Sequence, residues 1–314
     1  MDKRGVIEFS WIFSVIVGAI ILFLAFYFVG TNLLSQRYQQ STIAAQSLDI
    51  ILNPFAQFGE VKEMSQAPLA LEQLSTINIS CDYKAQGMGY NDITIATKGE
   101  QGIPRIVYDK YIYAEQSLET KKFQALSMPF EIPWRVADIM ILWPYDKKYC
   151  FMNAPAFIED ALGNSTSTGL NISSIHFSSC PAGSIKVCFG SGSGCDIKVE
   201  GAANHQGKTT KAGKSVFFAG DALMYASIFS EREIYNCNLR RLSSRITGQA
   251  QIYEEKARAL SGKGCSTAFN LAPLKTAADT VSGSTPPTDG QLNTLWQTSQ
   301  NIKSQNNVAD CNLF

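Results

Sequence analysis

The chain has 314 residues, of which 27 are basic and 27 acidic, so its formal net charge at pH 7 is zero. This balance offers no electrostatic footprint for DNA or RNA, and no nucleic-acid partner is expected. Hydrophobic residues make up 45% and aromatic residues 11% of the sequence, which is enough for a packed core and excludes disorder of the whole chain.

The N-terminus predicts a membrane anchor. Residues 1–8 form a short stub that carries Lys3 and Arg4, and residues 9–29 follow without a single charge. About 21 apolar residues are the length that a helix needs to cross a bilayer, so the first expected partner is lipid. Flanking basic residues stay in the cytoplasm, which places the larger C-terminal part outside the cell membrane. A cleavable secretory signal is the alternative, but its apolar region should be shorter and end in a small-x-small site.

An amphipathic stalk is expected directly after the anchor, over residues 30–53. No glycine or proline interrupts residues 31–53, and Asn53-Pro54 is a helix stop because the residue before proline is pushed out of helical geometry. One face of this helix carries a shallow apolar stripe, made of Leu34, Tyr38, Ser41, Ala45, Leu48 and Leu52. We expect the stripe to pack on the protein's own domain; the alternative is a seam with other copies of the chain or with envelope proteins.

The first 52 residues resemble type IV pilins and pilin-like secreted proteins. The resemblance is carried by the basic leader ending in Gly5, by Glu8, by the apolar residues 9–29 and by the amphipathic run 34–52. It implies cleavage between Gly5 and Val6, and a filament whose core is built from the N-terminal helices. In the family the acidic residue is the fifth after the cleavage site, whereas Glu8 is the third after Gly5.

Between residues 75 and 200 the apolar residues alternate with polar ones, which predicts half-buried β-strands. We expect an antiparallel, β-rich region with strands at 77–83, 92–97, 105–113, 138–143, 147–152, 172–177, 184–189 and 196–200. Pro129, Pro133 and Pro144 indicate loops or sheet edges. Pro155 followed by residues 156–162 predicts a short helix with proline at its start.

The rest of the chain reads as helices. A loop is expected at 201–214, then a helical region from Asp221, as its cap, to Ser261-Gly262, with Gly248 as a break or bend. Residues 278–290 contain Pro286-Pro287 and read as a flexible linker. A C-terminal helical tail, 291–314, completes the chain, with its helix near 292–302. The predicted fold class is therefore α+β: a transmembrane-plus-stalk helix, a central β-rich part and C-terminal helices, with one extracytoplasmic domain at 54–277.

All eight cysteines follow the anchor, on the side that we expect to be oxidising. An even number there predicts up to four disulfides, and buried free thiols are the alternative. The first expected pair is Cys188 with Cys195, at the tip of a hairpin whose loop is rich in glycine and serine; Cys150 with Cys180 is the second. Cys237 would tie the long helix to the sheet, Cys265 with Cys311 would clamp the tail, and Cys81 is the remaining candidate.

Sequence motifs for catalysis or cofactors are weak. The glycine-rich run 207–215 resembles a phosphate-binding loop, but five residues separate its glycines instead of four, so a solvated loop with Lys208, Lys211 and Lys214 is preferred. The chain has two histidines, His176 and His205, no C-x-x-C and no G-x-S-x-G, so no metal or other cofactor is expected.

Three Asn-x-Ser/Thr sequons, at Asn78, Asn164 and Asn171, are glycosylation candidates if the host modifies exported proteins. Taken together, the sequence predicts a single-pass, membrane-anchored structural or binding protein of the cell envelope, and not an enzyme. Two alternatives remain: a pilin-like subunit of a surface filament or secretion apparatus, and an anchored hydrolase with His176 or His205 as its base.

Overall fold

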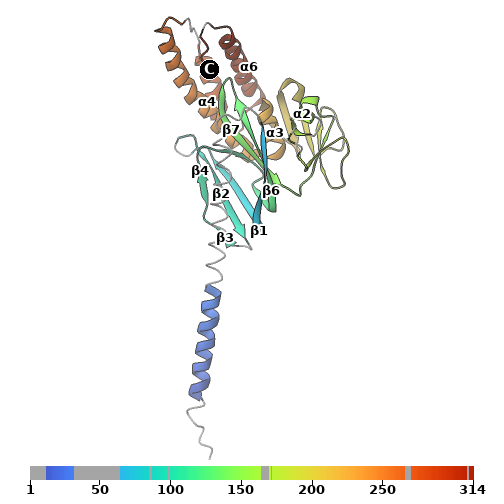
Figure 1. Ribbon diagram of the computed structural model, residues 1–314, viewed down its shortest axis with the longest axis vertical. Helices are drawn as coiled ribbons and strands as arrows, with labels where there is room; N and C mark the ends of the chain where they lie inside the picture. The colour runs from blue at the N-terminus through green and yellow to red at the C-terminus, as the bar shows by residue number, and fades with distance from the viewer. Residues whose placement is uncertain are drawn as a thin grey trace, which may run out of the picture.

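The computed structural model describes residues 12–31, 64–84, 87–97, 100–163, 170, 172–265, 270–309 and 311–314 (Figure 1). Several expectations fall outside these residues: the stalk 30–53 beyond residue 31, the processing site at Gly5 and Val6, and the sequons at Asn164 and Asn171. The described part is a mixed α+β protein with an N-terminal apolar helix, two β-sheets and C-terminal helices.

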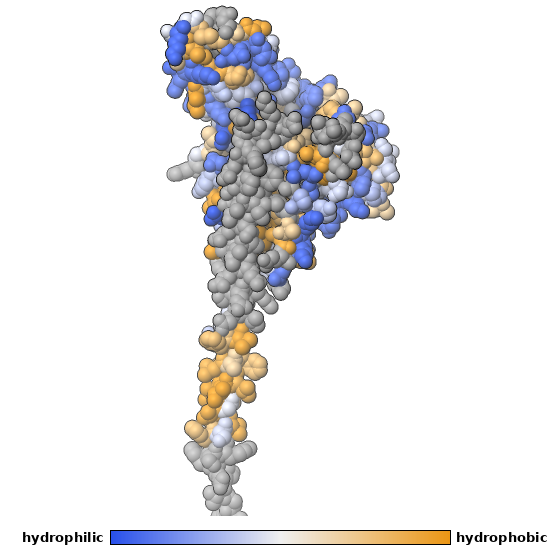
Figure 2. All heavy atoms as spheres, viewed as in Figure 1, coloured by the Kyte–Doolittle hydropathy of each residue, from blue (hydrophilic) through white to orange (hydrophobic). Residues whose placement is uncertain are grey.

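The N-terminal helix spans Ile12–Thr31 and is long and apolar enough to cross a membrane. None of its apolar window is buried against the rest of the protein, and Figure 2 shows it as a rod of hydrophobic side chains. A soluble helix of this composition would bury one face in a core. Its full exposure fits a segment whose surroundings are lipid.

The first sheet contains the N-terminal strands of the head. Its order is β3-β2-β1-β6-β7-β5, with β4 also paired to β2, and every pair is antiparallel except β5 with β7. The bounds are β1 Ser65–Asp82, β2 Tyr90–Thr97, β3 Glu100–Gln101, β4 Arg105–Val107, β5 Tyr111–Tyr113, β6 Ser117–Glu131 and β7 Arg135–Pro144.

Both faces of the first sheet are buried, because alternate side chains enter different hydrophobic clusters. On β7, Ile139, Ile141 and Trp143 join the main core with the helices and the second sheet. Met140 and Leu142 point the other way, into a smaller core. That smaller core also takes side chains from β1, β2, β4, β5 and β6, and from Ile234. The sheet therefore curls around this smaller core, so that β5, at one edge, contacts β2 on the other side of the sheet.

The second sheet has the order β13-β12-β11-β10-β8-β9. Its strands are β8 Tyr149–Met152, β9 Ile175–Phe177, β10 Ile185–Phe189, β11 Ile197–Glu200, β12 Gln206–Lys211 and β13 Lys214–Ala219. Strands β9, β8, β10 and β11 are parallel to one another, whereas β12 and β13 are antiparallel. The β-rich region is therefore mixed, and the expectation of an antiparallel region is wrong for this part.

The predicted hairpin at Cys188 and Cys195 is also wrong. Strands β10 and β11 are parallel, with Val187 opposite Ile197. After β10 the chain therefore returns along the strand, so that β11 begins beside the start of β10. At the end of this return the Asp196 N–H donates to the Lys186 carbonyl at 3.0 Å. The six residues between the two cysteines are enough for this return because their glycines permit sharp turns.

Helix α2, Ala156–Leu162, lies between β8 and β9, and a 3-10 turn, η1, spans Ala202–Asn204 between β11 and β12. The other helices follow the sheets, with bounds α3 Asp221–Phe229, α4 Arg232–Ser261, α5 Ala272–Gly283 and α6 Asp289–Asn307. The short helix at 156–162 and the end of the long helix at Ser261 are confirmed. Figure 1 shows α4 and α6 grouped at one end of the head, with β3 at the opposite end. Helix α5 packs between α4 and α6.

Three predictions on the helical part are corrected. The break lies at Ser230-Glu231, between α3 and α4, while Gly248 sits inside α4. Asp221 is the first residue of α3 and Gly220 is its N-cap. The linker at 278–290 is largely helical: α5 continues to Gly283, because Ala278 and Val281 are buried, and α6 starts after a capping box of Thr288 and Gln291.

Candidate binding cleft

All eight cysteines are paired in disulfides and none is free. Cys188–Cys195, Cys150–Cys180 and Cys265–Cys311 are the pairs that we expected, with Cα–Cα distances of 5.9, 5.3 and 5.8 Å. Cys237 does tie the long helix to a sheet: it bonds to Cys81 of β1, 156 residues earlier, at a Cα–Cα distance of 6.0 Å.

Asn78 lies in the middle of β1, between Thr94 of β2 and Ser117 of β6, with a half-buried side chain. Of the three sequon asparagines, only Asn78 belongs to the described part of the chain. Its place inside a paired strand differs from the accessible loops that carry glycans.

The two histidines occupy separate elements. His176 lies in β9, and its Nε2 is buried with no hydrogen-bond partner among the described residues. His205 follows η1, and its Nδ1 lies 2.7 Å from Asp221 Oδ1, a contact that the sequence did not reveal. Within the described residues, no serine or cysteine side chain hydrogen-bonds to His205. The contact joins the start of β12 to the start of α3, and the Gly220 N–H also donates to the His205 carbonyl at 2.6 Å.

The glycine-rich run 207–215 is a β-hairpin of β12 and β13 that turns at Ala212-Gly213, and strand β13, not a helix, follows its last glycine. The need for Gly207 comes from the neighbouring strand: a Cβ there would lie 1.9 Å from the Glu200 carbonyl oxygen. The expected solvated loop is therefore wrong. Among the described residues there is also no group of three His, Cys, Asp or Glu side chains that could hold a metal ion.

Lysine side chains on this hairpin have different surroundings. Lys208 pairs with Glu200 at 2.8 Å on the surface, and Lys214 is exposed. Lys211 instead donates from its Nζ to the Ser230 carbonyl at 2.9 Å. Burial lowers the pKa of Lys211 to about 8, against the opposing effect of Glu115 and Glu231.

Replacing Lys211 with methionine is expected to change how stability depends on pH. The folded-state pKa of Lys211 is about 8 and its ordinary value is 10.5, so protonation opposes folding below pH 8 and ceases to do so as the pH rises to 10.5. The stability of Lys211→Met relative to the native chain should therefore fall by up to about 3 kcal/mol across this window. Urea unfolding of both chains at matched pH values measures the difference, and a difference that does not change with pH would contradict the assignment.

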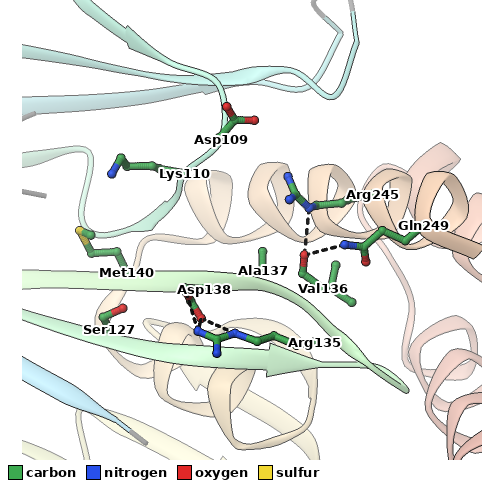
Figure 3. Close-up of a pocket in the computed structure, with 10 residues that line it drawn as sticks. All are labelled: Asp109, Lys110, Ser127, Arg135, Val136, Ala137, Asp138, Met140, Arg245 and Gln249. Atoms are coloured by element: carbon green, nitrogen blue, oxygen red, sulfur yellow. Dashed lines mark hydrogen bonds and ion pairs between the residues drawn. The ribbon is translucent and has the colours of Figure 1, made fainter. Parts of the chain in front are cut away.

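A polar cleft of about 290 Å³ lies where α4, the start of β7 and the segment between β4 and β5 meet (Figure 3). Its lining comes from four elements or connections and is mostly charged or polar: Asp109, Lys110, Ser127, Arg135, Val136, Ala137, Asp138, Met140, Arg245 and Gln249. Figure 3 shows Asp109 and Lys110 on one wall, Arg135 and Asp138 on the opposite wall, and Arg245 and Gln249 projecting from α4.

Helix α4 places its polar residues toward the sheet at intervals of one turn. Cys237, Arg241, Arg245 and Gln249 are four residues apart and so share one face of the helix. Arg245 Nε and Gln249 Nε2 both donate to the Val136 carbonyl, at 2.9 and 3.1 Å. The Trp134 indole N–H donates to Gln249 Oε1 at 2.8 Å. These bonds hold both side chains in fixed positions at the cleft.

Arg241 lies deeper on the same face and is 1% exposed. Its guanidinium donates six hydrogen bonds, to the amide oxygens of Asn91 and Asn238 and to the main-chain carbonyls of Met88, Gly89, Tyr108 and Lys110. The bonds to Tyr108 and Lys110 measure 2.7 and 3.0 Å and flank Asp109. Arg241 therefore fixes the backbone of the wall that carries Asp109.

The charges of the cleft are only partly paired. Arg135 and Asp138 form a bidentate ion pair, with Nη2 at 2.6 and 2.7 Å from the two carboxylate oxygens. In the part of the chain that the structure describes, neither Arg245 nor Asp109 has an ion-pair partner within 4.0 Å. The cleft therefore offers one guanidinium and one carboxylate to a ligand, held on a rigid frame.

The sequence did not point to this cleft, because its residues come from segments more than a hundred positions apart. One signal was present: Arg241, Arg245 and Gln249 each lie one position before a buried apolar residue of the long helix, so a polar line runs beside its apolar stripe. Comparison of the chain with protein-family models, curated proteins and solved structures finds no match.

Proposed function

We propose that this protein is a single-pass, membrane-anchored binding protein of the cell envelope, with a cytoplasmic N-terminus and an extracytoplasmic, disulfide-linked head. The observation that carries the proposal is the combination of a fully exposed apolar helix with four disulfides beyond it. Structural disulfides persist in oxidising compartments, and basic residues ahead of a span keep that end inside. The polar cleft supports a binding role for the head.

Topology is tested in intact cells with a membrane-impermeant maleimide. We expect the native chain to react only after reduction, because all its cysteines are paired outside the membrane. An Asp2→Cys variant should react only after the membrane is permeabilised, since its new thiol lies on the cytoplasmic side. Reaction of the native chain without reduction, or of the Asp2→Cys thiol in unpermeabilised cells, would contradict the proposal.

A second function is favoured by one specific observation, the basic leader that ends in Gly5 ahead of the apolar residues. It supports a pilin-like subunit that is cleaved before Val6 and assembles through its N-terminal helix. Intact-mass measurement of the chain purified from its host decides between the two. A mature chain that begins at Val6 supports the pilin-like function, and a chain that retains Met1 excludes it.

A further inference from the structure

We propose that the cleft between α4, β7 and the β4–β5 segment binds a small zwitterion of the α-amino-acid class, with Arg245 holding its carboxylate and Asp109 its ammonium group. This inference rests on the proposed binding function of the head and names the ligand class of that site. It does not depend on which side of the membrane the head occupies.

The recognition of a carboxylate follows from Arg245. The Arg245 Nε bond to the Val136 carbonyl fixes the plane of the guanidinium. The Tyr111 hydroxyl lies close enough to interact with the same guanidinium. The Nη groups form no ion pair with the described residues, so they can donate to the carboxylate of a ligand. A guanidinium presents parallel N–H groups that match the two oxygens of a carboxylate. Arg135 is not available to bind a carboxylate of the ligand, because its guanidinium is already paired with Asp138.

The ammonium group is assigned to Asp109. Its carboxylate is exposed at the rim of the cleft and forms no hydrogen bond or ion pair with the described residues, while Arg241 fixes the backbone on both sides of it. The cleft is lined by three cationic side chains and two carboxylates. A phosphate dianion would be repelled by Asp109, and a simple amine would meet Arg245 and Lys110, so a molecule with both charges suits the lining best.

The size of the cleft limits the ligand further. A volume of about 290 Å³ is at the small end of the range for ligand sites, which suits a free amino acid better than a peptide or a nucleotide. The Trp134 indole donates a 2.8 Å hydrogen bond to Gln249, so we expect its fluorescence to change when a ligand occupies the cleft.

The test uses the purified full-length chain in lipid nanodiscs. The twenty standard amino acids are screened at millimolar concentration by tryptophan fluorescence and calorimetry, each beside its analogue without the amine and its analogue without the carboxylate. We expect saturable binding of at least one amino acid and at least about tenfold weaker binding of both analogues, as expected for the loss of a charged hydrogen-bonded partner.

Variants identify the site. Arg245→Gln and Asp109→Asn should each weaken that binding by at least about tenfold, whereas Arg258→Gln, an exposed arginine at the far end of α4, should leave it unchanged. Asp109→Asn alters an exposed side chain, so its effect can be read even if Arg245→Gln destabilises the fold. No binding by any amino acid, binding that survives both substitutions, or equal binding of the analogues would each overturn the inference. The topology experiment is independent, so failure of the ligand and failure of the anchoring are distinguishable.

Discussion

Replacing Arg241 with alanine is expected to lower the free energy of unfolding of the head by about 4 kcal/mol or more, because several buried acceptors lose their donor at once. The guanidinium makes six hydrogen bonds, and within the described residues no carboxylate pairs with it. Its charge is instead stabilised by amide and carbonyl oxygens and by the ring of Tyr111, whose centroid lies 4.7 Å away.

Conservative and control variants separate the geometry of Arg241 from its charge. Arg241→Lys keeps the charge but offers three donors from a single point, so it should recover only part of the loss. Arg258→Ala, on the exposed surface of the same helix, should change stability by less than about 0.5 kcal/mol. Denaturant unfolding of the full chain in detergent measures all three, and an Arg241→Ala chain as stable as the native one would show that the hydrogen bonds contribute nothing net.

The second large effect is expected from the disulfide between Cys81 and Cys237. In the chain-entropy description, a cross-link between residues 156 positions apart contributes about 5 kcal/mol to stability. The Cys188–Cys195 bond closes a loop of only seven positions and should contribute about half as much. The double variant Cys81→Ala/Cys237→Ala should therefore unfold at a much lower denaturant concentration than Cys188→Ala/Cys195→Ala.

The comparison of the two disulfide variants contains its own control, because each double variant removes one disulfide and two sulfur atoms. If the short cross-link proves as important as the long one, local packing and not restriction of the unfolded chain accounts for the stabilisation. Cys237 is one helical turn before Arg241, and Cys81 Sγ lies 3.6 Å from Asn238 Oδ1, which also accepts from Arg241. The stability lost on removing the long disulfide and the stability lost on replacing Arg241 should therefore not be additive.

Some elements could be predicted because their pattern is local. Strand β2 alternates buried and half-buried residues along Tyr90–Thr97, and the prediction at 92–97 follows from that alternation alone. Strand β6 was missed because it is buried on both faces from Phe123 to Met128, so no alternation remains. Strand β12 was missed for the opposite reason: of its six residues only Thr209 is buried.

Long-range features needed the structure. The spacing of Cys188 and Cys195 fits a hairpin as well as a return loop, and only the register of β10 and β11 distinguishes the two. The partners of Arg241 are mostly main-chain carbonyls, which every residue carries and no sequence pattern marks. The cleft could not be predicted for the same reason, since its geometry depends on the bonds from Arg241 to the main chain of the segment between β4 and β5.

The regular spacing of Cys237, Arg241, Arg245 and Gln249 along α4 has a consequence for how this protein is made. The first of these residues is attached to β1 by a covalent bond that requires oxidation, and the following ones are positioned by the same helix. A chain synthesised without export would lack that attachment, and the wall of the cleft beyond it would be less firmly held. Under the proposed topology, maturation in the compartment where thiols are oxidised would therefore precede any binding in the cleft.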